Sequence, residues 1–281
     1  MGNEASIPVD LFNAGQVFAC MGFLEATSIL LGHSEGGFGW TEAVEPRFRV
    51  RSEGGGNPFE VVLDFLCGAQ LQRLAPAGFD DLQAGDNPPL CSTDTFPGPS
   101  ADRLSLPLRL VQQGGSIQIT HWCDASTRNP FKMFAGQQRS DAITSKMLEA
   151  IRKLWRESRD ELIRDPLGLT VPLGGSTFKL DARKAWTPID AGYSPDEQNH
   201  AVQASPVVEL LAAIGLEHAR PDEFRTREVR YGVWGGLVPP ALARAALGGV
   251  HLGIPMRFFR FTLALAGHNK NVTFAQEEAT Q

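Results

Sequence analysis

Apolar residues recur every three to four positions in five stretches of the chain, a period that predicts helices with one buried face. The first stretch follows Asn13, whose side chain can cap a helix. Gln16 then occupies the third helical position, and Gly32 provides the stop. We therefore expect a helix over residues 15–31. The same reasoning, with Asn57 and Pro58 starting the second helix, predicts four more helices over 58–74, 140–165, 206–216 and 240–247.

Alternation of polar and apolar residues predicts strands. Residues 47–51 alternate basic and apolar side chains, and residues 104–111 and 116–122 flank Gly114-Gly115, as in a β-hairpin. Further strands are expected over 228–234 and 256–266, whereas the glycines of 33–39 predict a turn. Residues 76–99, rich in Pro, Gly and Asp, predict a long loop.

The order of these elements shows no regular β-α-β alternation and no internal repeat, which predicts an α+β fold of mixed helices and antiparallel strands. A chain of 281 residues can form two subdomains. We place their boundary near residues 135–140. Residues 1–137 would form an N-terminal α+β domain, and residues 138–281 a long helix followed by a C-terminal α+β region.

Composition bounds the class of protein. With 42% hydrophobic and 21% charged residues, the chain is typical of globular proteins. We expect a cytoplasmic protein that does not span a membrane, because no basic and apolar leader and no long uninterrupted apolar window is found. No CxxC pair or clustered His spacing is present, which favours reduced thiols and no metal site. The cysteines are Cys20, Cys67, Cys91 and Cys123.

The net charge of −6 argues against nucleic-acid binding, but the charge is unevenly distributed. Residues 229–276 contain five basic residues and no acid, and residues 103–140 contain five basic residues and one acid, Asp124. This distribution is compatible with a basic face and an acidic back. On charge alone, an ordinary solvated surface explains it at least as well.

Catalytic signatures are missing from the sequence. It contains no GxSxG, GxGxxG or GxxxxGK[ST] motif, so we expect no catalytic residue and no cofactor. His121 and Cys123 could share one face of a strand end and form a thiol–imidazole site. A plain strand end is the favoured interpretation, because nothing in the sequence indicates a lowered thiol pKa or an oriented base.

Residues 129–139 are the most suggestive segment for nucleic-acid binding. Lysine and arginine contact phosphates, and paired amides read base edges. Phe131 and Phe134 could stack on unpaired bases, although burial of both rings in the core is the favoured interpretation. The candidate binding residues of this segment are Asn129, Lys132, Gln137, Gln138 and Arg139.

Residues 257–261 combine arginine with phenylalanine on a predicted strand. Arg257, Phe259 and Phe261 would point to one face, and Phe258 and Arg260 to the other. The glycines of the RNP1 motif are missing, so an edge strand with one buried face fits equally well.

Three passages carry a family resemblance. They are IPVDLFNAGQVFACMGFLEA at 7–26, NPFKMFAGQQRS at 129–140, and RYGVWGGLVPPALARAA at 230–246 followed by RFFRFTLALAGHNKNVTFAQEE at 257–278. Together they resemble the large subunit of the CRISPR Cascade complex of subtype I-U, also called I-G. The likeness covers both ends and the middle of the chain.

The resemblance implies a non-catalytic subunit of a crRNA-guided surveillance complex. Such subunits recognise the protospacer-adjacent motif (PAM) in target double-stranded DNA, support R-loop formation and help to recruit a helicase–nuclease. The implied partners are crRNA, target DNA, the other Cascade subunits and the helicase–nuclease. The family provides no motif-reading residues to transfer, so the five residues of 129–139 stay our own candidates. Backbone-contact candidates are Arg257, Arg260 and Lys270.

Three alternatives stay open at this point. The chain could be a crRNA-binding backbone subunit of the same complex, present in several copies. It could be a small-molecule enzyme with no readable motif. It could also be a bridging subunit that contacts only proteins, in which case removal of the basic residues would leave DNA affinity unchanged.

Overall fold

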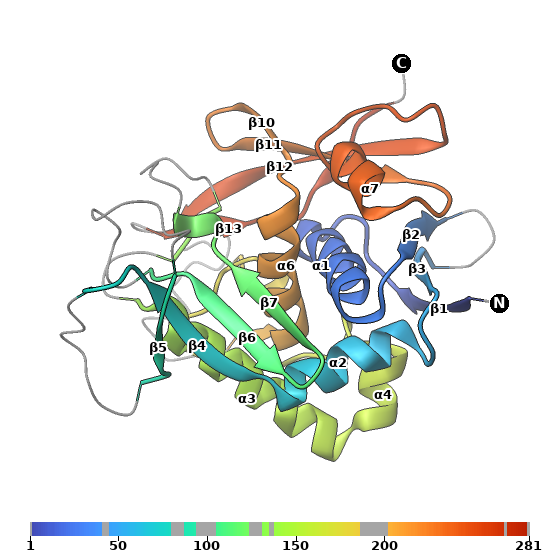
Figure 1. Ribbon diagram of the computed structural model, residues 1–281. Coiled ribbons are helices and arrows are strands. Elements are labelled where there is room, and N and C mark those ends of the chain that lie inside the picture. Colours follow the sequence, from blue (N-terminus) through green and yellow to red (C-terminus); the bar gives the residue numbers. More distant parts are fainter. Residues whose placement is uncertain are drawn as a thin grey trace.

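The computed structural model describes residues 2–40, 45–79, 87–93, 105–123, 131–134, 138–185, 202–266 and 269–279. Within these residues six α-helices alternate with fourteen strands in mostly antiparallel sheets, which confirms the α+β prediction (Figure 1). Helices α1 and α6 lie at the centre, with sheets on several sides of them.

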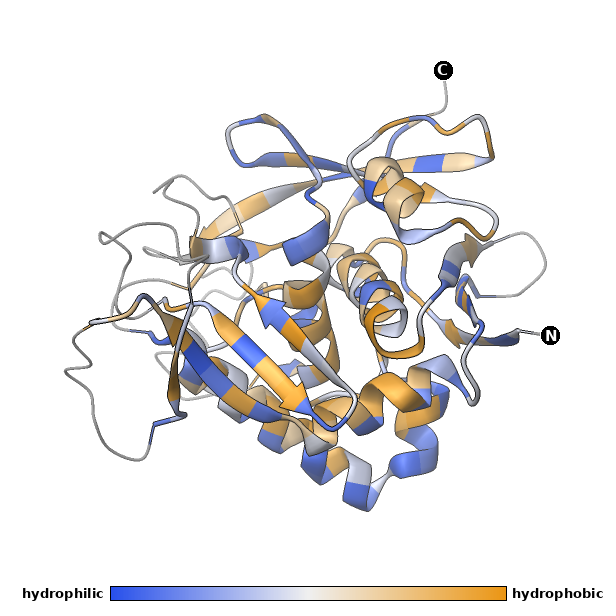
Figure 2. Ribbon diagram, in the orientation of Figure 1, coloured by the Kyte–Doolittle hydropathy of each residue, from blue (hydrophilic) through white to orange (hydrophobic). Residues whose placement is uncertain are grey.

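The central helices are α1 (Ala14–Leu31) and α6 (Pro206–His218). Their backbones approach closely, because a Cβ atom added to Gly22 would lie 2.0 Å from the carbonyl oxygen of Leu211. Figure 2 shows both helices apolar on most sides, as expected for helices surrounded by protein. Helix α1 is long and apolar enough to cross a membrane, but 78% of it is buried inside the protein, and it is therefore a core helix.

A three-stranded antiparallel sheet lies beside α1. Its order is β1 (Asn3–Pro8), β3 (Arg47–Ser52) and β2 (Ser34–Gly39), so the glycine-rich turn predicted over 33–39 is wrong. The glycines instead admit a neighbouring backbone, since a Cβ atom on Gly37 would lie 1.8 Å from the carbonyl oxygen of Gly236. Strand β3 buries Phe48 and Val50 and turns its arginines outward, as the alternation predicted.

A second sheet has the order β5 (Leu90–Ser92), β4 (Gln70–Ala75), β6 (Leu108–Gln112) and β7 (Gly115–Ile119). The β6–β7 hairpin confirms the prediction. Helix α2 (Pro58–Gly68) starts as predicted, with the side chain of Asn57 accepting a hydrogen bond from the Phe59 amide. It ends earlier than predicted, because the residues after Gly68 pair with β6 as β4.

The predicted helix over 140–165 is divided. Helix α3 (Ser140–Glu157) and helix α4 (Arg159–Arg164) meet at Ser158, whose φ of −147° and ψ of 42° are not helical. One stripe of α3 is buried, and α3 packs against α2, α6 and β4. Two short strands, β8 (Val171–Pro172) and β9 (Gln203–Ala204), pair in this region.

The C-terminal sheet has the order β10 (Asp222–Arg225), β11 (Glu228–Trp234), β12 (Met256–Ala266) and β13 (Asn269–Val272), with β14 (Gln276–Glu277) also beside β12. Its inner face packs on α1, where the rings of Phe18 and Tyr231 lie 5.8 Å apart. Helix α7 (Pro240–Leu247) covers the outer face at Gly232.

Residues of both predicted subdomains belong to one hydrophobic core, since α1 and α6 make the most extensive contact between elements. The division into 1–137 and 138–281 stays a prediction.

Candidate nucleic-acid interface

A groove of about 480 Å³ crosses the outer face of the C-terminal sheet, away from α7. It extends from β10 over β11 and β12 to the segment that leads into β14. Residues of all these elements line it: Phe224, Arg225, Glu228, Arg260, Phe261, Thr262, Thr273, Phe274 and Gln276.

Two phenylalanines of the groove are exposed to solvent. Phe224 is 41% exposed and Phe274 is 51% exposed, whereas Phe261 is buried. Aromatic side chains of this size are usually buried, where they contribute most to stability. Two exposed rings in one groove therefore offer flat apolar surfaces to a ligand.

The positive charge of the groove comes from Arg260 and Arg225. Arg260 is exposed on the outer face of β12 and has no ion pair among the residues that the structure describes. Arg225 lies 3.8 Å from Glu228, and both side chains are largely exposed, so the pair is weak. Arg230, opposite Arg260 in the register, is bonded instead to Glu278 at 2.8 Å.

Most other basic residues of the acid-free segment 229–276 are neutralised by acids from outside it. Arg244 binds Glu25 with two hydrogen bonds of 2.6 and 2.7 Å. Arg257 binds Glu277 in the same way, at 2.6 and 2.5 Å, and the hydrogen bond with Glu277 raises the pKa of Arg257. This face therefore carries less unpaired positive charge than the number of basic residues in 229–276 suggests.

The predicted faces of β12 are observed. Phe259 and Phe261 are buried on the inner face of β12, the face that also carries Arg257. Arg260 lies on the other face and points outward. Lys270 lies half-buried on β13, opposite Leu265. Of the three backbone-contact candidates, the structure places only Arg260 in the groove.

The segment 129–139 lies elsewhere, before α3. Asn129 and Gln137 fall outside the described residues, and Lys132 lies half-buried with its ammonium 5.7 Å from the centroid of Phe134. Phe131 and Phe134 are 3% and 2% exposed, which confirms the core interpretation of both rings. They are not available for stacking.

Arg139 and Gln138 lie immediately before α3. The Arg139 guanidinium donates hydrogen bonds to Asp141 and, at 2.6 Å, to Asn87. Gln138 is half-buried, and its Oε1 has no hydrogen-bond partner in the described part of the chain. The contacts of Arg139 are those of a residue that fixes the start of α3, and DNA reading by this segment stays a prediction.

His121 and Cys123 lie in a short 3₁₀-helix after β7, not at a strand end as predicted. Burial lowers the pKa of His121 to about 3. The Cys123 thiol donates a hydrogen bond of 2.9 Å to the carbonyl of Ser105. A thiol held by a carbonyl is not activated as a thiolate, so this pair does not form the geometry of a cysteine nucleophile.

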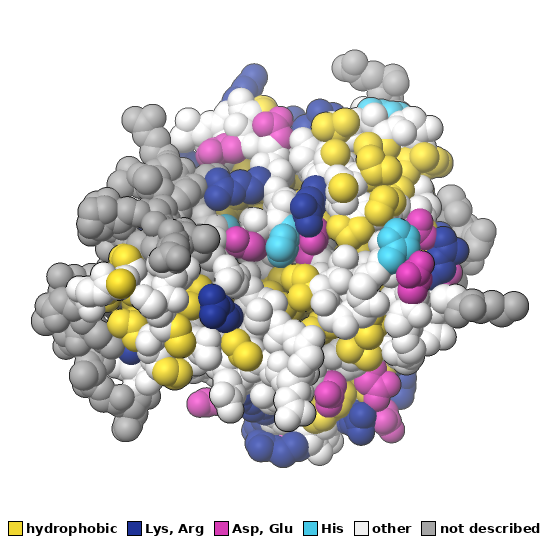
Figure 3. All heavy atoms as spheres, viewed as in Figure 1, with side chains coloured by type: hydrophobic (Ala, Val, Ile, Leu, Met, Phe, Trp, Pro, Cys, Tyr) yellow, Lys and Arg dark blue, Asp and Glu magenta, His cyan; other side chains and the backbone are white. Residues whose placement is uncertain are grey.

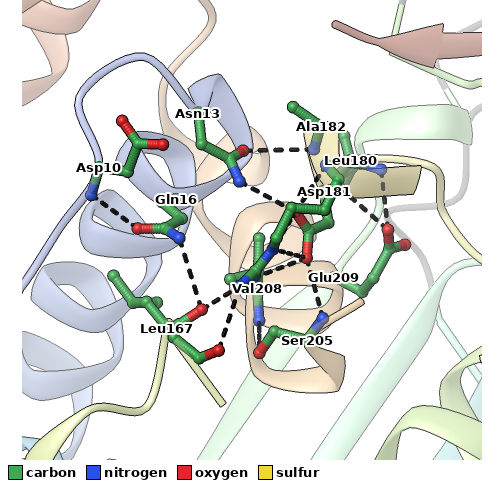
Figure 4. Close-up of polar contacts among 12 residues, drawn as sticks. Asp10, Asn13, Gln16, Leu167, Leu180, Asp181, Ala182, Ser205, Val208 and Glu209 are labelled. Carbon is green, nitrogen blue, oxygen red and sulfur yellow. Dashed lines mark hydrogen bonds and ion pairs between the residues drawn. The ribbon is translucent and has the colours of Figure 1, made fainter. Parts of the chain in front are cut away.

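A buried polar cluster joins the start of α1 to α6 (Figure 4), and we call it the Asp181 cluster. Asn13 donates to Asp181 at 2.9 Å and accepts from the Ala182 amide at 3.2 Å. Asp181 also accepts from the Ser205 amide and from the Arg183 guanidinium. The cluster is largely satisfied internally, which is typical of a structural network.

Glu209 of α6 is the exception in this cluster. One carboxylate oxygen accepts from the amides of Leu180 and Asp181, at 3.1 and 3.0 Å, while Oε2 has no partner in the region described. Burial raises the pKa of Glu209 to about 7. The described residues contain no group of three His, Cys, Asp or Glu side chains that could hold a metal ion.

Figure 3 shows a second surface, where apolar side chains gather over α7 and the segment after it. Leu242 is 47% exposed and Val250 is 54% exposed. Arg244 of the same helix is paired with Glu25, so this surface offers little positive charge to phosphates.

The sequence reasoning missed Phe224, Arg225 and Phe274. The available signal was an aromatic residue beside arginine in the short hairpin 222–228, but only the sheet order brings Phe274 to the same groove. Comparison with known proteins adds no further residue: no protein-family model, no curated protein and no solved structure matches this chain.

Proposed function

We propose that this chain is a non-catalytic, nucleic-acid-binding subunit of a type I crRNA-guided surveillance complex in the cytoplasm. The observation that carries the nucleic-acid part is the groove on the C-terminal sheet, in which Arg260 is exposed and lacks an ion pair among the described residues. The resemblance of three sequence passages to the Cascade large subunit supports the assembly part.

The groove suits contact with a phosphate backbone. An arginine fork binds phosphate with two parallel hydrogen bonds, and the hydroxyl of Thr262 and the amide of Gln276 provide neutral donors nearby. The Thr273 hydroxyl donates to the Thr262 carbonyl at 2.7 Å. In RNA-guided complexes the protein reads a short duplex motif, and base pairing reads the rest of the sequence. We assign this chain to PAM recognition, to support of the R-loop and to recruitment of the helicase–nuclease.

The neutralised arginines fit a subunit that acts inside an assembly. A protein of net charge −6, whose groove is lined by two arginines and one glutamate, has little long-range attraction for DNA by itself. In a complex, neighbouring subunits can provide most of the positive channel. This favours a peripheral contact over the continuous RNA channel of a crRNA-binding backbone subunit.

Ultraviolet cross-linking of the tagged chain in its host cells tests the proposal. We expect cross-linked nucleotides on peptides of residues 222–228 and 256–276, and about a tenfold lower yield for Arg260→Ala, because a charged phosphate contact is lost. Arg156→Ala, which removes an exposed arginine of α3, is the matched control and should leave the yield unchanged. An absence of cross-linked nucleic acid on the wild-type chain would contradict the proposal.

A further inference from the structure

We infer that the groove of the C-terminal sheet binds unpaired nucleotides, with Phe224 and Phe274 stacking on bases while Arg260 and Arg225 contact phosphates. The inference rests on the proposed function and names the class of nucleic acid that this groove takes.

The exposed rings favour unpaired bases over a duplex. In a duplex each base is already stacked on its neighbours, so its flat faces are closed to protein side chains. Unpaired bases stack readily on aromatic side chains, whatever the sequence. Among nucleic acids, a single strand or an unwound end therefore offers free base faces to Phe224 and Phe274, and a closed duplex does not.

The sheet order separates the two rings. Phe224 lies on β10, and Phe274 lies just before β14, with β11 and β12 between them. Three strand spacings of about 4.8 Å separate these positions. Such a separation suits two different bases of one strand, and it does not suit the two faces of a single base.

The polar residues lie between the rings. Arg260 is opposite Gln276 in the β12–β14 register, and Thr262 follows on the same face of β12. Arg225 can leave Glu228 at little cost, because both side chains are exposed and 3.8 Å apart. Glu228 also places a negative charge in the groove, so contact with any phosphate depends on the two arginines.

The test measures affinity of the assembled complex for fluorescent single-stranded and duplex oligonucleotides of one sequence. We expect Phe224→Ala with Phe274→Ala to weaken single-strand binding about tenfold or more, because each stacked base contributes about 1–3 kcal/mol. Duplex binding should stay within about twofold, whereas Arg260→Ala should weaken both. Phe224→Tyr with Phe274→Tyr keeps the flat rings and should restore single-strand binding.

Leu242→Ala is the control, since Leu242 is 47% exposed on α7 and does not line this groove. Equal single-strand affinity of the double alanine variant and the wild type would overturn the stacking inference. If Arg260→Ala still weakened binding in that case, the proposed function would stand without the stacking inference. Failure of the wild-type complex to bind any oligonucleotide would overturn both, and would leave a protein segment as the occupant of the groove.

Discussion

Asn13 precedes a helix as predicted, but its side chain has a different role from the predicted helix cap. The sequence indicates a helix cap, and α1 does begin at Ala14, but the Asn13 side chain makes no cap hydrogen bond. It bonds instead to Asp181 and Ala182, which are more than 160 positions away in the chain. Gln16 likewise accepts from the Asp10 amide and does not complete a capping box.

Asn13→Ala should therefore cost more stability than loss of a local cap. It leaves the Ala182 amide without its buried acceptor and removes one hydrogen bond from Asp181 Oδ1, which keeps those from Arg183, and we expect a loss of about 2–3 kcal/mol in the free energy of unfolding. The matched control is Asn57→Ala, which removes the cap of α2 and should cost about 1 kcal/mol. Urea unfolding measures both, and equal losses would contradict a structural role for the Asp181 cluster.

Glu209 predicts a pH dependence of stability. Its pKa is raised from 4.5 to about 7 in the folded protein, so the folded state binds the proton more tightly than the unfolded state. Stability should consequently fall as the pH rises from 4.5 to 7, by up to about 3 kcal/mol from this group. Glu209→Gln keeps an acceptor for the two amides and should remove this contribution.

The measurement is the difference in unfolding free energy between Glu209→Gln and the wild type at several pH values. The difference should shift in favour of the variant as the pH rises through this range. A difference that does not change with pH would show that Glu209 titrates normally.

At the scale of elements, the contact between α1 and α6 depends on glycine. A Cβ atom on Gly22 would meet the Leu211 carbonyl oxygen at 2.0 Å, and one on Gly215 would meet the Phe18 carbonyl oxygen at 2.1 Å. Both obstacles are backbone atoms, which cannot move away as a side chain can. The helices can pack this closely only while both positions lack a side chain.

Gly22→Ala should destabilise the protein by about 3 kcal/mol or more, despite the better helix propensity of alanine. Gly55→Ala is the control, because a Cβ atom there has nothing within 4 Å, and its effect should stay within about 0.5 kcal/mol. Thermal unfolding monitored by circular dichroism compares them. A Gly22→Ala variant as stable as Gly55→Ala would refute the close approach.

The helices and strands with clear local patterns were predictable. The cap at Asn57, the alternation in β3, the β6–β7 hairpin and the α6 and β12 segments follow from neighbouring residues alone. The glycines of β2 were wrongly predicted to form a turn. Glycine is needed there because the backbone at Gly236, distant in the chain, packs against this strand, and no local pattern reveals that contact. The same limit applies to the groove, whose residues come together only through sheet order.

At the scale of the whole molecule, charge in the sequence and charge on the surface differ. The acid-free segment 229–276 suggests a strongly basic face, but Glu25, Glu277 and Glu278 neutralise three of its arginines in the folded protein. Arg260 and the half-buried Lys270 are left from this segment, and Arg260 lies with Arg225 and Glu228 in a small groove that carries two exposed phenylalanines. Such a surface fits a subunit that contributes one contact to a larger nucleic-acid channel.

Purification of the tagged chain from its native host tests the proposed membership of a crRNA-guided complex. The RNA that co-purifies would be sequenced, and the co-purifying proteins identified by mass spectrometry. We expect repeat-derived crRNA together with other CRISPR subunits, and we expect the Arg260→Ala variant to retain them because assembly does not depend on the groove. A chain recovered as a monomer, with neither crRNA nor CRISPR proteins, would contradict it.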